Sequence, residues 1–165
     1  MVRLYSPEPI AKIASASRDA EKIGLVVSLL RNIHLAAAAE AISFASFLQA
    51  DMAQFYELVN AAAGGTAMFR SRGPEMIALS ATASSSSSSS IKPAVNGTAA
   101  ASESSRTLDD AVEELAVVVQ RAREVNCPLH LGNAVLSILL AAKRRGYGGL
   151  SDSHVIRMWE GVGSA

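Results

Sequence analysis

The sequence predicts an all-α domain, and three observations lead to this fold class. Hydrophobic residues make up 50% of the 165 residues, many of them alanine, whereas aromatic residues make up only 5%. Alanine-rich, aromatic-poor chains favour closely packed helices over sheets. Between about Arg18 and Gln49, Gly24 is the only glycine and proline does not occur. No segment shows the alternation of apolar and polar side chains that predicts a strand.

The first predicted helix, from about Arg18 to Gln49, is apolar on nearly every face, which is typical of a helix buried on all sides. A helix of about 30 residues spans about 45 Å, and the other helices of one small subunit cannot cover it fully. The sequence therefore predicts a homodimer formed through a long buried first helix. We expect residues 1–17, with Pro7 and Pro9, to be a flexible N-terminus.

Two shorter helices follow in the first half of the chain. Asp51 is a good N-cap for a helix from Met52 to about Ala62, which the glycines at 64–65 would end. A third short helix is predicted from Thr66 to about residue 78.

The middle of the chain is of low complexity. Residues 80–106 include seven consecutive serines and cannot bury enough apolar surface to fold, so we expect a disordered serine-rich insertion. It would separate the two halves of one helical domain, residues 18–79 and 107–161.

The second half predicts three more helices. Thr107 and Asp110 form a capping box that opens the first of them. Pro128 separates this helix from another, about Leu131–Arg145. Ser151 then caps a last helix that runs from residue 152 to about residue 160.

Composition and motifs exclude several classes of function. Fifteen basic residues balance fifteen acidic ones, so nothing indicates binding to nucleic acid or to an anionic membrane. The histidines are scattered, no zinc spacing appears, and no GxGxxG or Walker loop occurs. The first ten residues lack the apolar core of a secretory signal, and no uninterrupted apolar run approaches the ~18 residues of a membrane span. We therefore expect a cytoplasmic protein.

Several short motifs occur in an order and spacing that make chance an unsatisfactory explanation. They are the alanine-rich segment that ends at Glu40, Ala63-Gly64-Gly65-Thr66-Ala67-Met68-Phe69, Arg72-Gly73-Pro74-Glu75-Met76, Glu113-Glu114-Leu115, Pro128-Leu129-His130 and Gly146-Tyr147-Gly148. This succession resembles the second, all-helical domain of the β-hydroxyacid dehydrogenase family, in its 3-hydroxyisobutyrate and threonate-like branch. The resemblance implies a helical domain like the C-terminal domain of 6-phosphogluconate dehydrogenase.

The chain departs from the family pattern at the positions that the resemblance implies for catalysis. The family's general acid/base lysine falls at Gly24, its companion asparagine at Ser28, a tryptophan at Ala67 and a second lysine at Glu113. Lys22 is two residues away, which is about 200° around a helix, and does not substitute for the lost side chain. The Rossmann domain that holds the cofactor in the family has no counterpart in this sequence. We expect no bound cofactor in this chain alone, and NAD(P) only if a partner supplies a Rossmann domain.

Two classes of function stay open. The first is a diverged stand-alone domain that has lost autonomous hydride transfer and reuses a reshaped small-molecule pocket, as a cofactor-free biosynthetic enzyme with Glu113 or His34 as acid/base. Its predicted pocket residues are Gly24, Ser28, Gly64, Gly65, Thr66, Ala67 and Phe69. The second is a catalytically inactive oligomerisation partner, forming a heterodimer with a full-length dehydrogenase, or a truncated oxidoreductase.

Overall fold

The computed structural model describes residues 8–84 and 106–159, and within these ranges the chain is helical with no β-strand. The all-α fold class predicted from the sequence is therefore confirmed. Thr107 and Ser151 form an isolated bridge outside any strand. The helices are α1 (Glu8–Phe47), α2 (Met52–Ala61), α3 (Ala67–Ser84), α4 (Leu108–Glu124), α5 (His130–Ala142), the π-helical turn η1 (Lys143–Tyr147) and the 3₁₀ helix η2 (Asp152–Met158).

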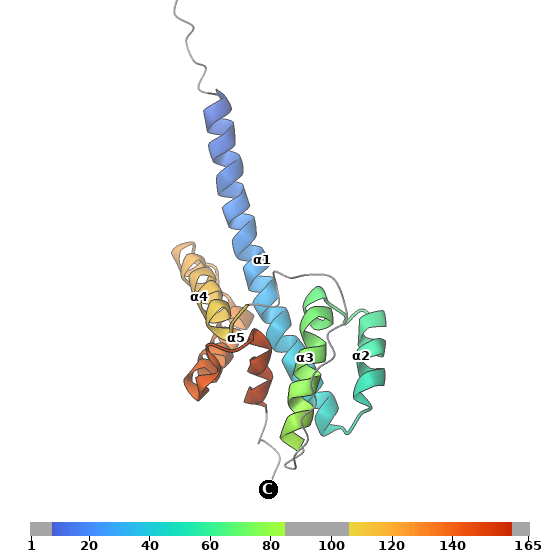
Figure 1. Cartoon of the computed structure of the whole chain (residues 1–165). Helices are drawn as coiled ribbons and strands as arrows, with labels where there is room; N and C mark the ends of the chain where they lie inside the picture. The colour runs from blue at the N-terminus through green and yellow to red at the C-terminus, as the bar shows by residue number, and fades with distance from the viewer. Residues whose placement is uncertain (1–7, 85–105, 160–165) are drawn as a thin grey trace, which may run out of the picture.

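The long helix α1 is the axis of the domain (Figure 1). The helices α3, α4, α5 and η2 all contact it, and α2 contacts both α3 and α1. Figure 1 shows the N-terminal end of α1 projecting beyond the other helices, which gather around its C-terminal half. The core lies where these helices meet, around the inaccessible side chains of Leu35, Ile42, Met76, Leu115 and Leu139.

The helix α1 begins at Glu8 and not near residue 18, and its 40 residues correspond to about 60 Å. Pro9 is tolerated because it lies in the first turn, where a backbone N–H has no intrahelical acceptor. The helix ends where Gln49 adopts a left-handed conformation with φ of 57°. Asp51 then caps α2 as predicted, accepting hydrogen bonds from the backbone N–H groups of Ala53 and Gln54.

Within one chain, α1 has a buried face and an exposed apolar face. Leu35, Ala39 and Ile42 are inaccessible to solvent, whereas Ile23 and Phe44 are 63% and 64% exposed. The described part of a single chain therefore leaves one face of α1 uncovered, as we expected from the length of this helix.

By length and composition, the Asp19–Phe47 part of α1 could cross a membrane, but this is weak evidence. The central helix of a soluble protein meets the same criteria, and a third of the apolar window is buried against the rest of the domain. α1 also buries the polar side chains of Asn32 and Ser43.

Helix α3 contains Pro74 in its interior and still continues to Ser84, past the predicted end near residue 78. A proline inside a helix leaves the carbonyl four residues earlier without its usual donor, here the carbonyl of Arg70. The hydroxyl of Tyr56 on α2 donates a hydrogen bond to that carbonyl at 3.0 Å. Most of the serine-rich insertion, residues 85–105, lies outside the described residues.

The second half matches the predicted elements with local differences. Thr107 and Asp110 form both hydrogen bonds of the predicted capping box of α4. α5 ends at Ala142, three residues before the expected end, because the chain widens into the turn η1, where Gly146 has a φ of 93°. The last helix is 3₁₀ rather than α, and Ser151 caps it through the N–H of Ser153.

We predict that Thr107→Ala will lower the free energy of unfolding by about 1 kcal/mol, because it removes the side-chain acceptor for the N–H of Asp110. Urea titration followed by circular dichroism measures this change. Thr107→Ser keeps the hydroxyl and is the matched control, for which we expect near wild-type stability. Equal losses in both variants would show that the methyl group, and not the cap, matters.

Candidate functional site

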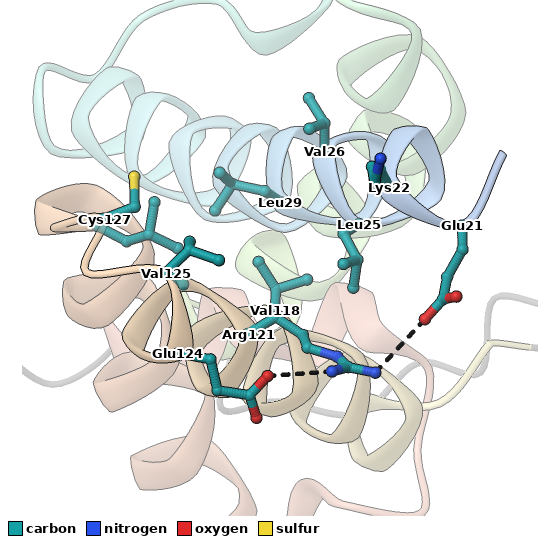
Figure 2. Close-up of a pocket in the computed structure, with 12 residues that line it drawn as sticks. Glu21, Lys22, Leu25, Val26, Leu29, Val118, Arg121, Glu124, Val125 and Cys127 are labelled. Atoms are coloured by element: carbon teal, nitrogen blue, oxygen red, sulfur yellow. Dashed lines mark hydrogen bonds and ion pairs between the residues drawn. The ribbon is translucent and has the colours of Figure 1, made fainter. Parts of the chain in front are cut away.

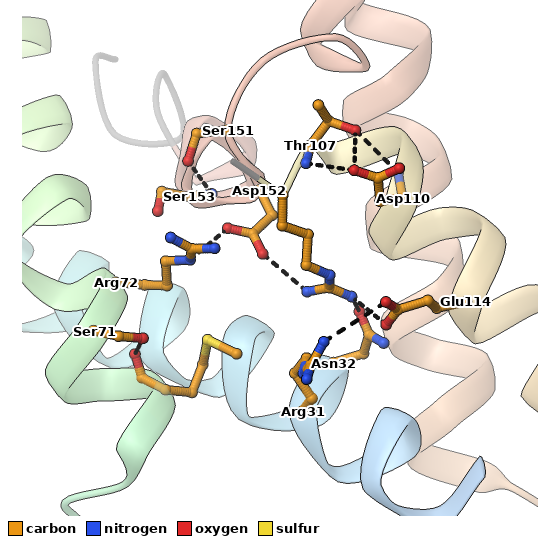
Figure 3. A network of polar contacts seen from close by, with 12 residues as sticks. Arg31, Asn32, Ser71, Arg72, Thr107, Asp110, Glu114, Ser151, Asp152 and Ser153 are labelled. Atoms are coloured by element: carbon orange, nitrogen blue, oxygen red, sulfur yellow. Dashed lines mark hydrogen bonds and ion pairs between the residues drawn. The ribbon is translucent and has the colours of Figure 1, made fainter. Parts of the chain in front are cut away.

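The described residues contain one buried group of charged side chains, which we call the Asp152 cluster. The cluster joins α1, α3, α4 and η2 with Arg106, which lies two residues before the start of α4. Its members are Arg31, Asn32, Arg72, Arg106, Glu114 and Asp152 (Figure 3).

Asp152 is the centre of this cluster and is inaccessible to solvent. Its Oδ1 lies 2.8 Å from Nε of Arg72, and its Oδ2 accepts a hydrogen bond of 2.9 Å from Nη1 of Arg106. Both arginine side chains are less than one tenth exposed. Burial raises the pKa of Asp152 above its ordinary value, and the two guanidinium groups oppose that rise by favouring the carboxylate.

Arg106 connects this ion pair to α1 and α4. Its Nη2 donates hydrogen bonds to Oδ1 of Asn32 at 3.0 Å and to Oε2 of Glu114 at 2.8 Å. Asn32 in turn donates to the carbonyl of Ser28 at 2.8 Å. At the outer end, Arg31 lies 3.7 Å from Glu114, and both side chains are one third exposed. The arginines of the cluster therefore already have carboxylate partners, so the cluster acts as an internal joint.

Sequence reasoning does not find this cluster. Arg106 and Asp152 are 46 residues apart, and Arg106 and Asn32 are 74 apart. The one available signal is the position of Arg72 at the start of the Arg72–Met76 motif. That motif supports the family resemblance, but it assigns no role to the arginine.

The two predicted acid/base residues lie outside the Asp152 cluster. Glu113 is exposed on α4, next in sequence to Glu114 but directed elsewhere, and its charge helps to raise the pKa of Lys143. The largest cause of that raised pKa is the hydrogen bond from Lys143 to Asp109, whose Oδ1 lies 2.8 Å from Nζ. His34 is half-buried on α1.

The predicted pocket residues of α1 differ in their surroundings. Gly24 is exposed, and a Cβ placed on it would have no atom within 4 Å. Ser28 is half-buried one turn later, and its backbone carbonyl accepts a hydrogen bond from the side-chain amide of Asn32. Lys22 is exposed and pairs with Asp19 at 3.0 Å, so its ammonium group is directed along the helix surface.

The predicted pocket residues between α2 and α3 form a helix start and part of the core. The hydroxyl of Thr66 accepts a hydrogen bond from the N–H of Phe69 at 3.0 Å, so Thr66 caps α3. Gly64 and Ala67 are exposed and Gly65 is half-buried. The buried ring of Phe69 stacks on Tyr56, with 5.5 Å between the ring centres, and meets the edge of Phe55.

The structure does not bring Gly24 and Glu113 together. The helices α1 and α4 run antiparallel, since Arg31 meets Glu114 whereas Glu21 meets Arg121. These pairs place Gly24 near the level of residues 118–121, which lie five to eight residues, or about 8–12 Å, along α4 from Glu113.

Two surface cavities lie beside α1. The first, of about 470 Å³, lies between α1 and the end of α4, with apolar walls and the ion pairs of Arg121 with Glu21 and Glu124 at its edge (Figure 2). The second, of about 530 Å³, is a groove along the C-terminal half of α1. None of the predicted site residues lines either cavity. The described residues contain no group of histidine, cysteine, aspartate and glutamate side chains that could hold a metal ion.

We predict that Asp152→Asn will lower the free energy of unfolding by about 3–5 kcal/mol, because it leaves two buried guanidinium groups without their shared counter-charge. Urea unfolding at constant salt measures it. The matched control is Glu124→Gln, which removes a pair with Arg121 in which both side chains are about half exposed, and we expect a change below ~1 kcal/mol. A small effect at Asp152 would show that the cluster is not a structural joint.

Comparison with known proteins gives consistent relatives, although no family model matches the chain. The L-threonate dehydrogenase of Haemophilus influenzae is 30% identical over 165 positions, which cover 96% of this chain and 48% of the relative. The L-threonate dehydrogenase of Cupriavidus necator is 26% identical over 153 positions, which cover 93% of this chain and 44% of the relative.

A solved structure agrees with these relatives. The crystal structure of 3-hydroxyisobutyrate dehydrogenase from Salmonella typhimurium superposes with a TM-score of 0.66 and 25% identity, and covers 83% of this chain and 41% of that one. The chain thus spans about half the length of the curated relatives it matches. It is homologous to the C-terminal helical part of the L-threonate and 3-hydroxyisobutyrate dehydrogenases.

Proposed function

We propose that this chain is an assembly domain of the hydroxyacid-dehydrogenase type that carries out no NAD(P)-dependent hydride transfer by itself. The observation that carries this proposal is Gly24, which stands where the family resemblance implies the acid/base lysine. Oxidation of a hydroxyl group needs a proton acceptor beside it, and glycine offers none. Apart from its own helix backbone and chain neighbours, a Cβ at this position would have no atom within 4 Å, so the position faces open space.

Nearby groups do not restore the function. The ammonium group of Lys22 is paired with Asp19, and Glu113 lies about 8–12 Å from the level of Gly24 along α4. The open cavity beside this part of α1 has mostly apolar walls, including Leu25, Val26 and Leu29, and charged side chains such as Lys22 and Arg121 lie among its lining residues. Such walls suit a hydrophobic group better than a small hydroxyacid, whose carboxylate and hydroxyls need polar partners.

The described residues do not fit a nicotinamide cofactor. A dinucleotide is held at a glycine-rich turn between a strand and a helix, and residues 8–84 and 106–159 contain no strand. We therefore derive no step through NAD(P), which in our proposal comes only with a Rossmann domain from a partner.

A reshaped pocket with Glu113 or His34 as acid/base is the less favoured candidate. It would need Glu113 to move toward Gly24, and His34 is only half-exposed in the middle of α1. A cytoplasmic homodimer, or a heterodimer with a full-length relative, fits the assembly role better, because α1 exposes a long apolar face.

We predict that the purified chain will not form NADH or NADPH from L-threonate or 3-hydroxyisobutyrate, as followed by absorbance at the nicotinamide band. Gly24→Lys, which the open space at Gly24 accommodates, is expected to be equally inactive, because the cofactor still lacks a site. The L-threonate dehydrogenase of Haemophilus influenzae serves as positive control. Nucleotide reduction by the chain alone, lost on heat denaturation, would overturn the proposal.

A further inference from the structure

The cavity between α1 and the end of α4, which we call the α1–α4 cavity, has mainly apolar walls. Its volume is about 470 Å³, within the ~300–1,000 Å³ of sites that bind small molecules. Residues three or four positions apart on each helix lie on one face, so both helices present apolar side chains to the same space. These walls comprise Leu25, Leu29, Val118, Ala122, Val125 and Leu129.

Apolar side chains at the mouth of the α1–α4 cavity are left in water. Val26 on α1 is 56% exposed, and Val125, just past the end of α4, is 72% exposed. Val118, on the same face of α4 as Val125, is buried. The cavity therefore extends from a buried wall to an exposed apolar mouth. A molecule that fills it with apolar atoms removes both from water, which is favourable.

The space in this cavity depends on the small side chain of Ala122. Ala122 lies four residues after Val118 and three before Val125, so it belongs to the same face of α4. It is half-buried, and it contributes only a methyl group to the wall opposite α1. A larger side chain at this position would occupy the cavity itself.

The charged side chains at the edge of the cavity already have partners. Arg121 pairs with Glu124 at 3.0 Å and with Glu21 at 3.5 Å. Lys22 pairs with Asp19 at 3.0 Å. A carboxylate brought to this edge would meet two glutamates, and an ammonium group would meet Lys22 and Arg121. Neither finds an unpaired counter-charge, so an uncharged molecule is the best complement to the cavity.

The α1–α4 cavity is separate from the positions that the family resemblance implies for catalysis. Gly24, Ser28 and Glu113 do not line it. Leu25 and Leu29 each follow one of these α1 positions, and one residue corresponds to about 100° around the helix. A molecule in the cavity would touch α1, α4 and the connection to α5 together, so its binding would hold these elements to one another.

We propose that the α1–α4 cavity binds an uncharged, mainly aliphatic small molecule. Its apolar chain lies between the α1 wall and Ala122, and its one polar group, of the hydroxyl type, lies at the charged edge and accepts or donates hydrogen bonds there.

This binding site goes beyond the assembly role and does not depend on it. A chain that binds the uncharged molecule and also reduces NAD(P) would refute only the proposed function. An inactive chain that does not bind the molecule would refute only the binding site.

The first experiment compares probes of equal chain length that differ only in the head group: 1-octanol, octanoate and octylammonium. Calorimetric titration of the full chain should show saturable binding of 1-octanol, and binding of both charged probes at least about tenfold weaker. 1-Hexanol, two methylenes shorter, should also bind roughly tenfold more weakly, because each buried methylene strengthens binding up to about fourfold. Absence of saturable 1-octanol binding, or equal binding of a charged probe, would overturn the proposal.

The second experiment locates the probe through Cys127, which lines the cavity at the end opposite Glu21 (Figure 2). Cys127 is exposed and is the single cysteine of the chain, so the intact mass reports its alkylation by iodoacetamide. Saturating 1-octanol should slow this alkylation at least about threefold, because the bound chain covers the thiol. An unchanged rate at saturation would place the probe elsewhere and would overturn the proposal.

Two pairs of variants test the walls. Ala122→Phe fills the cavity and should weaken 1-octanol binding at least about tenfold, whereas Ala116→Phe, on an exposed part of α4 outside the cavity, should leave it unchanged. Val125→Lys places a charge at the exposed mouth and should weaken binding similarly. Its matched control is Val117→Lys, since Val117 is 54% exposed and does not line the cavity.

Circular dichroism identifies the variants that fold, and Val125→Lys is expected to fold because Val125 is largely exposed and a cation suits the end of a helix. Unchanged 1-octanol binding by a folded cavity variant would overturn the proposal. Protection of Cys127 by phosphatidylcholine vesicles but not by 1-octanol would also overturn it, because the apolar mouth would then contact a membrane surface instead of a free small molecule.

Discussion

The arrangement of the helices depends on the ion pairs of one buried carboxylate. Asp152 forms ion pairs with Arg72 from the first half of the domain and with Arg106 from the start of the second, on either side of the segment 85–105. Removing one partner from a buried carboxylate costs free energy of folding. A different packing of the helices that separates both ion pairs would cost more. The cluster therefore favours the one packing in which α3, α4 and η2 meet at α1, more than the apolar core alone would.

The same cluster sets the rotation of α1. Arg106 donates a hydrogen bond to the amide oxygen of Asn32, and the next residue before Asn32, Arg31, forms an ion pair with Glu114. Leu30 is two residues from Asn32, about 200° around the helix, so anchoring Asn32 inward turns Leu30 outward, where it is 48% exposed. The exposed apolar face of α1 and the buried ion pairs thus lie on opposite sides of one helix, and the contacts of Asn32 help to keep that face outward.

Local signals in the sequence predict much of the fold. Asp51 and Thr107 cap α2 and α4 as expected, because a cap depends only on residues two or three positions away. The hydrogen bond by which Tyr56 satisfies the carbonyl of Arg70, left without its donor by Pro74, is not predictable in this way, since Tyr56 lies on another helix. The Asp152 cluster escapes prediction for the same reason, because no local rule relates residues that are 46 or 74 positions apart. The candidate pocket rests on motif order, which carries no information on the distance between Gly24 and Glu113.

Catalysis and association place different demands on α1. For hydride transfer, the family resemblance implies one particular side chain at position 24, and this chain has glycine there. Association requires only apolar side chains at intervals of three and four residues, and many substitutions satisfy that requirement. Gly24 itself lowers the helix propensity of α1 by about 1 kcal/mol relative to alanine, a cost without benefit in an isolated helix. In our proposal, a helix with glycine at this position and a long exposed apolar face fits a surface for another helix better than the wall of an active site.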